Sequence, residues 1–229
     1  MLNWVCLFFV LGPSPPATFR GDKDLEPEIM SLIDKIDQKN ATIESLRATF
    51  RQHKEISLLT EPLDTEGVFY LKKSEGMRFE FQPGDDLTLI INKEEMVSLS
   101  PGAKKASRFK IKRRRGLIQK LLSDRLGTLT KYFDLELLPS ETGQDRGLLL
   151  KPAKRKVRKR FQEIRIWVGG DDLIRRLKVV SDDGDVMDLT LEDITIDAEV
   201  PSELFDTTIP EDFTLEDRMD FLFGADAGF

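Results

Sequence analysis

The sequence predicts a mainly β, antiparallel fold, and three observations lead to this expectation. Apolar and polar residues alternate in many short segments, which is the pattern of strands with one buried face. Short turns rich in Gly, Pro and Asp separate these segments, so neighbouring strands should be antiparallel. Stretches with helical spacing occur near the start and in the middle, and we expect roughly ten or eleven strands and two or three helices.

The amino terminus differs from the rest of the chain. Residues 2–12 are apolar, and Pro, Ser and Ala follow up to Ala17 before the first charge at Arg20. This stretch is too short for a helix that spans a bilayer, but it fits the apolar region of a signal peptide. We expect residues 1–17 to be a signal peptide and residues 18–229 to form a single domain with an acidic C-terminal tail. The alternatives are a misplaced start codon and an apolar tail that packs on the domain.

The first half begins with a helix and continues as strands. Residues 26–39 carry Ile29, Leu32, Ile33 and Ile36 at helical spacing. From residue 46 the period changes to two, as Leu46, Ala48 and Phe50 alternate with polar residues. Turn signals then divide the chain into further strands, which we expect at residues 67–72, 77–81, 87–91 and 96–99.

The middle of the chain interrupts the sheet. Residues 115–132 carry leucine and isoleucine at helical spacing, which predicts one or two amphipathic helices. Strand periodicity then returns, and we expect strands at residues 135–138, 148–150, 164–168, 174–180, 186–191 and 194–196. So many one-sided strands can close into a barrel, pack as two sheets, or form one curved sheet whose concave face is covered by helices.

Composition excludes several kinds of chemistry. Of the 229 residues, only Cys6 is a cysteine and only His53 a histidine, so a disulfide framework, a Cys/His zinc cluster and Cys–His catalysis are excluded. A Ser–His–Asp triad would need His53, which we interpret as a surface residue on the polar side of its strand. Asp182–Asp183 and Glu211–Asp212 fall in turns, where Asp is common for backbone reasons. We expect no enzymatic activity, no metal site and no cofactor.

Five segments follow one another along the chain with a characteristic order and spacing. They are Thr49–Phe50–Arg51–Gln52, residues 67–81 (GVFYLKKSEGMRFEF), residues 148–152 (LLLKP), the hairpins of residues 164–191, and residues 204–214 with Ile209–Pro210. Together they resemble the outer-membrane lipoprotein carrier (LolA) family over about residues 27–217. The resemblance implies an unclosed, strongly curved antiparallel half-barrel with the helices as a lid over its concave side.

The resemblance also implies a function. Family members bind the acyl chains of lipoproteins in the hollow and carry them across the periplasm without catalysis. It therefore implies a monomer in the periplasm, with acylated lipoproteins, an inner-membrane release complex and an outer-membrane acceptor as partners. Nucleic acid is not expected, because the basic runs lack interleaved aromatic residues. The alternative is an envelope-stress sensor, or another module that binds a hydrophobic ligand on the same fold.

The chain departs from the family at the lid. An Arg–Pro pair helps to hold the lid closed in the family, and the matching positions here are Lys73 and Ser74. Lysine lacks the planar guanidinium that can contact several carbonyls at once. Arg78 could replace the family arginine only if it reached the lid, but alternation places it on the convex face.

The apolar residues of the one-sided strands are the candidate lipid-binding residues. On the strands these are Leu46, Phe50, Met77, Phe79, Phe81, Leu89, Ile91, Ile164, Ile166, Leu189 and Leu191; the candidate lid residues are Leu117, Ile118, Leu121 and Lys73. The alternative is that the same side chains form a filled core.

Charge is unevenly distributed along the chain. Residues 104–115 and 151–160 are basic runs without acidic residues, whereas residues 181–220 are strongly acidic. The basic runs predict an anionic partner, such as a lipid headgroup, a membrane surface or an acidic protein, unless they are simply a solvated face.

Overall fold

The structure is a computed structural model that describes residues 26–82, 86–110, 125–140 and 146–216. Twelve strands form one sheet in the order β12-β6-β5-β4-β3-β2-β1-β11-β10-β9-β8-β7. The strands are β1 (Ser45–Glu55), β2 (Leu63–Lys72), β3 (Gly76–Gln82), β4 (Thr88–Asn92), β5 (Glu95–Ser100), β6 (Lys105–Lys110), β7 (Phe133–Leu138), β8 (Arg146–Pro152), β9 (Phe161–Val168), β10 (Ile174–Ser181), β11 (Val186–Ile196) and β12 (Thr214–Glu216). Because β7 and β12 lie at opposite edges, the sheet is not closed, as the half-barrel prediction requires.

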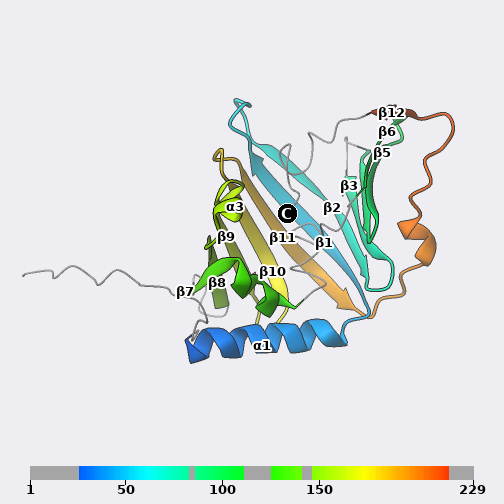
Figure 1. Cartoon of the computed structure of the whole chain (residues 1–229). Helices are drawn as coiled ribbons and strands as arrows, with labels where there is room; N and C mark the ends of the chain where they lie inside the picture. The colour runs from blue at the N-terminus through cyan, green and yellow to red at the C-terminus, as the bar shows by residue number, and fades with distance from the viewer. Residues whose placement is uncertain (1–25, 83–85, 111–124, 141–145, 217–229) are drawn as a thin grey trace, which may run out of the picture.

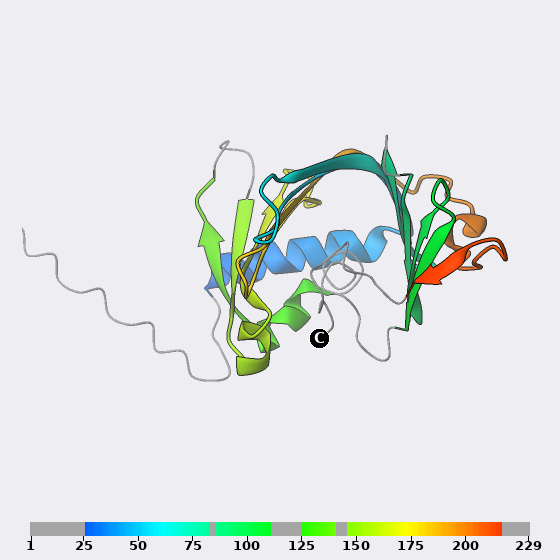
Figure 2. The ribbon, with the colours of Figure 1, turned by 90° about the horizontal axis from the view of Figure 1, so that it is seen from above.

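The sheet curves into an arch, and helix α1 (Pro27–Thr42) lies on its inner side (Figure 2). In Figure 1, α1 crosses one end of the strands. Its buried residues Ile29, Leu32, Ile33 and Ile36 recur at helical spacing and join the apolar cluster of the concave face. Pro27 lies in the first turn, where its missing N–H is not needed. The helix predicted at residues 26–39 is thus confirmed and extends three residues further.

Strand β1 is the centre of the sheet and sets its two faces. Buried residues alternate along it with exposed or half-buried ones, so Leu46, Ala48 and Phe50 face the concave side. β1 pairs antiparallel with both β2 and β11. Residues 186–191 and 194–196, predicted as two strands, are one strand with a β-bulge. The bulge lies opposite Ala48, and it includes Asp193 with a φ of 49°.

Two strands were not predicted. β6 lies in the first basic run, where the sequence KASRFK shows no regular alternation. β12 has only three residues and pairs parallel to β6, so it raises the number of strands to twelve. The chain reaches it along the outer side of the arch through the 3-10 helix η2 (Ser202–Phe205) (Figure 2).

The other helical segments in the described part of the chain are short. Within the expected helical region 115–132, residues 126–131 form the 3-10 helix η1 (Leu126–Lys131), and residues 115–124 lie outside the described residues. A single turn, α3 (Arg155–Arg158), in the second basic run was not predicted. The expected signal peptide at residues 1–17, with Cys6, and the end of the acidic tail beyond residue 216 also lie outside the described residues.

Aromatic rings pack at the centre of the concave face. The ring of Phe50 contacts those of Phe79 and Phe81 edge-on, with centroids 5.4 and 5.1 Å away. Gly67 is the Cα partner of both Phe50 and Phe81. A Cβ at Gly67 would lie 1.9 Å from the Glu80 carbonyl oxygen and 2.9 Å from the Phe50 ring. Glycine is therefore required there for close approach of the backbone of β3.

Substitution of this glycine should destabilise the sheet. We expect Gly67→Ala to lower the free energy of unfolding by about 1–3 kcal/mol or more, because the new methyl group collides with a backbone atom. Gly170→Ala is the control, since nothing lies within 4 Å of its Cβ position, and it should change stability by less than about 0.5 kcal/mol. Urea denaturation measures both. Equal stability of the two variants would contradict the packing described for β2 and β3.

Candidate functional site

The eleven candidate lipid-binding residues lie together on the concave face. They come from five strands, β1, β3, β4, β9 and β11, and all belong to one cluster of buried apolar side chains. None is more than 7% exposed. The alternation of each strand thus brings together residues from positions 46 to 191 into one apolar surface.

Helix α1 and η1 cover part of this surface and are joined to each other. The Asp37 carboxylate on α1 accepts hydrogen bonds from the backbone N–H groups of Leu126 (2.5 Å) and Gly127 (3.2 Å). This caps the start of η1, whose Leu126 and Leu129 enter the apolar cluster. The candidate lid residues Leu117, Ile118 and Leu121 lie outside the described residues. Leu126 and Leu129 were not named as lid residues, although they share the same helical spacing.

Lys73, which the resemblance matches to the arginine that holds the lid in the family, contacts the end of α1. Its ammonium donates hydrogen bonds to the carbonyl oxygens of Asn40 (3.3 Å) and Ala41 (3.0 Å). It also lies 3.9 Å from the Glu44 carboxylate. These carbonyls belong to the last turn of α1, where a cation is favoured by the helix dipole. The hairpin between β2 and β3 is therefore attached to the covering helix by one lysine.

Arg78 has a different role, on the convex face where alternation predicts it. It donates hydrogen bonds to the Glu80 carboxylate (2.7 Å) and to the Leu204 carbonyl oxygen (2.8 Å). It thus fixes η2 on the outside of the arch, on the face of the sheet opposite α1.

Polar residues occupy one end of the concave row of β1. Gln52 and Lys54 follow Phe50 on the same face, and they are only 6% and 8% exposed. The hydroxyl of Thr65 lies 3.5 Å from the Gln52 side-chain oxygen. Burial lowers the pKa of Lys54 from its usual 10.5 to about 8, because a buried ammonium loses hydration. Sequence analysis did not single out Lys54, although continued alternation beyond Phe50 places it on the inner face.

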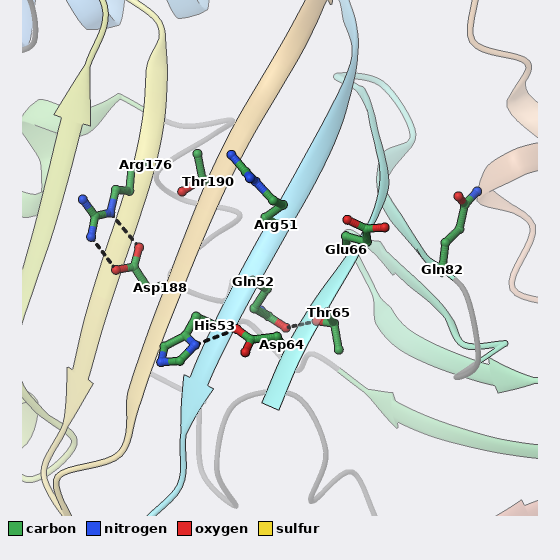
Figure 3. A pocket seen from close by; sticks show the side chains of 10 residues that line it. All are labelled: Arg51, Gln52, His53, Asp64, Thr65, Glu66, Gln82, Arg176, Asp188 and Thr190. Atoms are coloured by element: carbon green, nitrogen blue, oxygen red, sulfur yellow. Dashed lines mark hydrogen bonds and ion pairs between the residues drawn. The ribbon is translucent and has the colours of Figure 1, made fainter. Parts of the chain in front are cut away.

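The convex face carries a separate, polar pocket of about 570 Å³ (Figure 3). Arg176 and Asp188 form an ion pair at 2.7 Å on one side, and His53 contacts Asp64 at 2.6 Å on the other. The hydrogen bond to Asp64, the largest cause, raises the pKa of His53, and Glu55 adds to the effect. His53 is a surface residue held by carboxylates, as the sequence predicts.

The two basic runs differ in their surroundings. Lys104 and Lys105 of the first run form ion pairs with Asp212 (3.0 Å) and Glu216 (2.7 Å) of the acidic C-terminal segment. In the second run the residues around α3 are exposed; they are Lys154, Arg155, Lys156, Arg158 and Lys159. At the start of this second run Lys151 pairs with Glu136 (2.9 Å), and the five exposed residues around α3 form a cationic surface.

In the described ranges, no three or more His, Cys, Asp or Glu side chains are grouped so that they could hold a metal ion. No helix within those same ranges is both long and apolar enough to cross a bilayer.

The contacts of Lys73 predict that its loss loosens α1. We expect Lys73→Met to increase hydrogen exchange of α1 amides roughly tenfold, because two charge-assisted hydrogen bonds of about 1–2 kcal/mol in total are lost. Lys72→Met is the matched control, since Lys72 binds the Ser202 hydroxyl on the convex side. Unchanged exchange in α1 of the Lys73 variant would show that this residue does not secure the helix.

The buried Lys54 predicts an unusual dependence of stability on pH. The unfolded chain keeps the proton of Lys54 up to about 10.5, whereas the folded chain releases it near 8. Between these two pH values the unfolded state binds more protons than the folded state. The contribution of Lys54 to the free energy of unfolding therefore increases as the pH rises, by roughly 3 kcal/mol in total. Relative to Lys54→Met, wild-type protein should gain about 2–3 kcal/mol of unfolding free energy between about pH 7 and pH 10. Parallel stability curves for the two proteins would refute the burial of a charged lysine.

Several solved structures are similar to this chain. An uncharacterized conserved protein from Thermus thermophilus is similar with a TM-score of 0.51 and 12% identity, over 82% of this chain and 98% of that one. A LolA superfamily protein from Nitrosomonas europaea is similar with a TM-score of 0.41 and 13% identity, over 77% and 96%. The Pseudomonas aeruginosa MucA/MucB complex is similar with a TM-score of 0.47 and 10% identity, over 79% and 61%.

The sequence itself identifies the family. None of the curated proteins matches it. The model of the outer membrane lipoprotein carrier protein LolA family matches residues 41–208, which is most of the chain and includes strands β1 to β11. The resemblance found from short segments of the sequence is thereby confirmed: this chain is a member of the LolA family.

Proposed function

We propose that this protein is a periplasmic carrier that binds the acyl chains of lipoproteins against its concave face and transports them toward the outer membrane. The observation that supports this most is the apolar surface built by five strands of an unclosed sheet. An apolar, curved surface of this kind is typical of sites that hold a hydrophobic ligand. Membership of the lipoprotein carrier family supports the same ligand class.

Binding of an acyl chain there follows from the hydrophobic effect. Each CH₂ group that leaves water contributes about 0.8 kcal/mol, so an acyl chain can bind tightly without polar recognition. The concave residues are buried in this structure, so a ligand must displace part of what covers them. Helix α1 is a suitable moving part, because Lys73 and Asp37 secure it through hydrogen bonds. Opening would break these polar contacts and expose the four buried apolar side chains of α1, so the bound acyl chain must offset the loss of that apolar burial.

The remaining parts of the proposal follow from the sequence. A cleaved leader at residues 1–17 would export the chain to the periplasm. A carrier works by binding and release, so it needs no catalytic pair. Its partners would be acylated lipoproteins, a release complex in the inner membrane and an acceptor at the outer membrane, and the carrier itself would act as a monomer.

Photo-crosslinking tests where an acyl chain lies. We expect a fatty acid with a diazirine in its chain to label Leu189 and Leu191 of β11, which face the concave side, in preference to Asp188 and Thr190, which face outward. Peptide mass spectrometry locates the labelled residues. Adjacent residues of one strand serve as internal controls, because they lie on opposite faces of the same part of the sheet.

Native mass spectrometry of the protein expressed with its leader tests the cargo. We expect acyl-bearing ligand to accompany part of the preparation. The carrier proposal fails if no preparation contains acyl ligand and the diazirine probe labels the two faces of β11 equally. Capture of a membrane-bound regulator in place of acylated cargo would instead favour the alternative function, an envelope-stress sensor.

A further inference from the structure

Three leucines are exposed together on the hairpin that joins β1 and β2. Leu58 is 91% exposed, Leu59 48% and Leu63 39%. Each of these side chains leaves apolar surface in contact with water, where it contributes nothing to the stability of the fold. Exposed apolar side chains that are grouped in this way are typical of a surface that contacts a protein or a membrane.

Hydrogen bonds hold the tip of this hairpin in place. The backbone N–H of Leu59 donates to the Ile56 carbonyl oxygen (2.8 Å), which closes a turn over Ser57 and Leu58. The backbone N–H of Ser57 donates to the Asp185 carboxylate (2.7 Å), which joins the tip to the turn between β10 and β11. The leucines are therefore presented on the outside of a braced turn.

A basic cluster lies at the same end of the sheet as this tip. Glu55, the last residue of β1, pairs with Val186 of β11, and Ser181 of β10 pairs with Phe161, the first residue of β9. The turn α3 directly precedes β9. Figure 1 shows the hairpin tip and α3 at the end of the strands opposite α1, with the tip extending further than α3. The exposed basic residues around α3 are Lys154, Arg155, Lys156, Arg158 and Lys159.

Acidic residues separate the tip from the basic cluster. Asp182, Asp183 and Asp185 lie in the turn from β10 to β11, and Glu55 and Glu61 lie on the hairpin. The tip must therefore bind through its apolar side chains, whereas attraction for anions is concentrated at α3. This division fits a bilayer, which offers an apolar layer beneath anionic headgroups. A soluble anion offers charge alone and gives no reason for exposed leucines.

We propose that this end of the molecule docks on the surface of an anionic bilayer, with Leu58 and Leu59 inserted below the headgroups and the basic cluster at α3 in contact with them. Burial of apolar side chains and attraction to anionic lipids add to each other at such an interface. The inference goes beyond the proposed function and does not depend on it, since docking needs no bound cargo. In a carrier, docking would place the end of the concave face away from α1 next to a membrane.

Flotation with lipid vesicles tests the role of the leucines. We expect the full-length protein to float with vesicles of phosphatidylcholine that contain about 30% phosphatidylglycerol. Leu58→Ser combined with Leu59→Ser should lower the partition coefficient about tenfold or more, because both apolar side chains are lost from the interface. Met30→Ser is the matched control, since Met30 is 49% exposed on α1 at the other end of the strands; it should bind within about twofold of wild type.

Charge reversal at α3 tests the contact with headgroups. Lys156→Glu should lower binding to the anionic vesicles roughly tenfold, and its effect should shrink at high salt. Lys35→Glu reverses an exposed charge on α1 and should leave binding within about twofold of wild type. All these proteins share the same amino terminus, so its apolar residues cannot account for a difference between them.

The outcomes are distinct from those of the carrier proposal. A wild-type protein that stays off the anionic vesicles would overturn the docking, as expected if the tip contacts a protein instead. A leucine variant that floats as well as wild type, or loss of binding in Met30→Ser, would place the contact elsewhere and overturn it too. Diazirine labelling of β11 is measured without vesicles, so either proposal can fail while the other stands.

Discussion

The register of β1 against its two neighbours is the constraint on which the rest of the structure depends. β1 lies in the interior of the sheet and pairs with β2 on one side and β11 on the other. A slip of one residue would turn Phe50 outward and place Arg51 on the concave face. The close approach of Phe50 to Gly67 and the backbone of β3 allows only one alignment. Packing at its centre therefore determines which residues form the concave face. The strands farther from β1 are oriented by pairing, directly or through other strands, with β1.

The cover is attached in a different way from the sheet. Helix α1 contributes four apolar side chains to the concave cluster, but its ends and its link to η1 depend on hydrogen bonds from Lys73 and to Asp37. The polar contacts are few and partly exposed, whereas the apolar side chains of the helix are almost fully buried. The proposed loading of a ligand would therefore have to break both kinds of contact.

The sequence predicted the face of each strand better than the edges of the sheet. Alternation placed Leu46 and Leu191 on one surface because a one-sided strand shows its buried face directly in the order of its residues. β6 and β12 were not predicted. Neither segment alternates, and their pairing joins residues near position 106 with residues near position 215. The bulge at Asp193 interrupts the two-residue period, so the sequence predicted two strands where the structure has one. Lys73 was recognised as a departure from the family, but only coordinates could place its ammonium on the carbonyls of α1.

The concave face can be interpreted as a ligand site or as a filled core. Burial of apolar side chains is common to both interpretations, so the eleven concave residues favour neither by themselves. In the described part of the chain, α1 and η1 cover this face with buried apolar side chains of their own. An acyl chain that took the place of α1 would keep the strands covered, since one apolar contact surface would replace another. The proposed carrier function therefore requires an exchange of covers, in which the ligand must offset the apolar contacts that α1 loses.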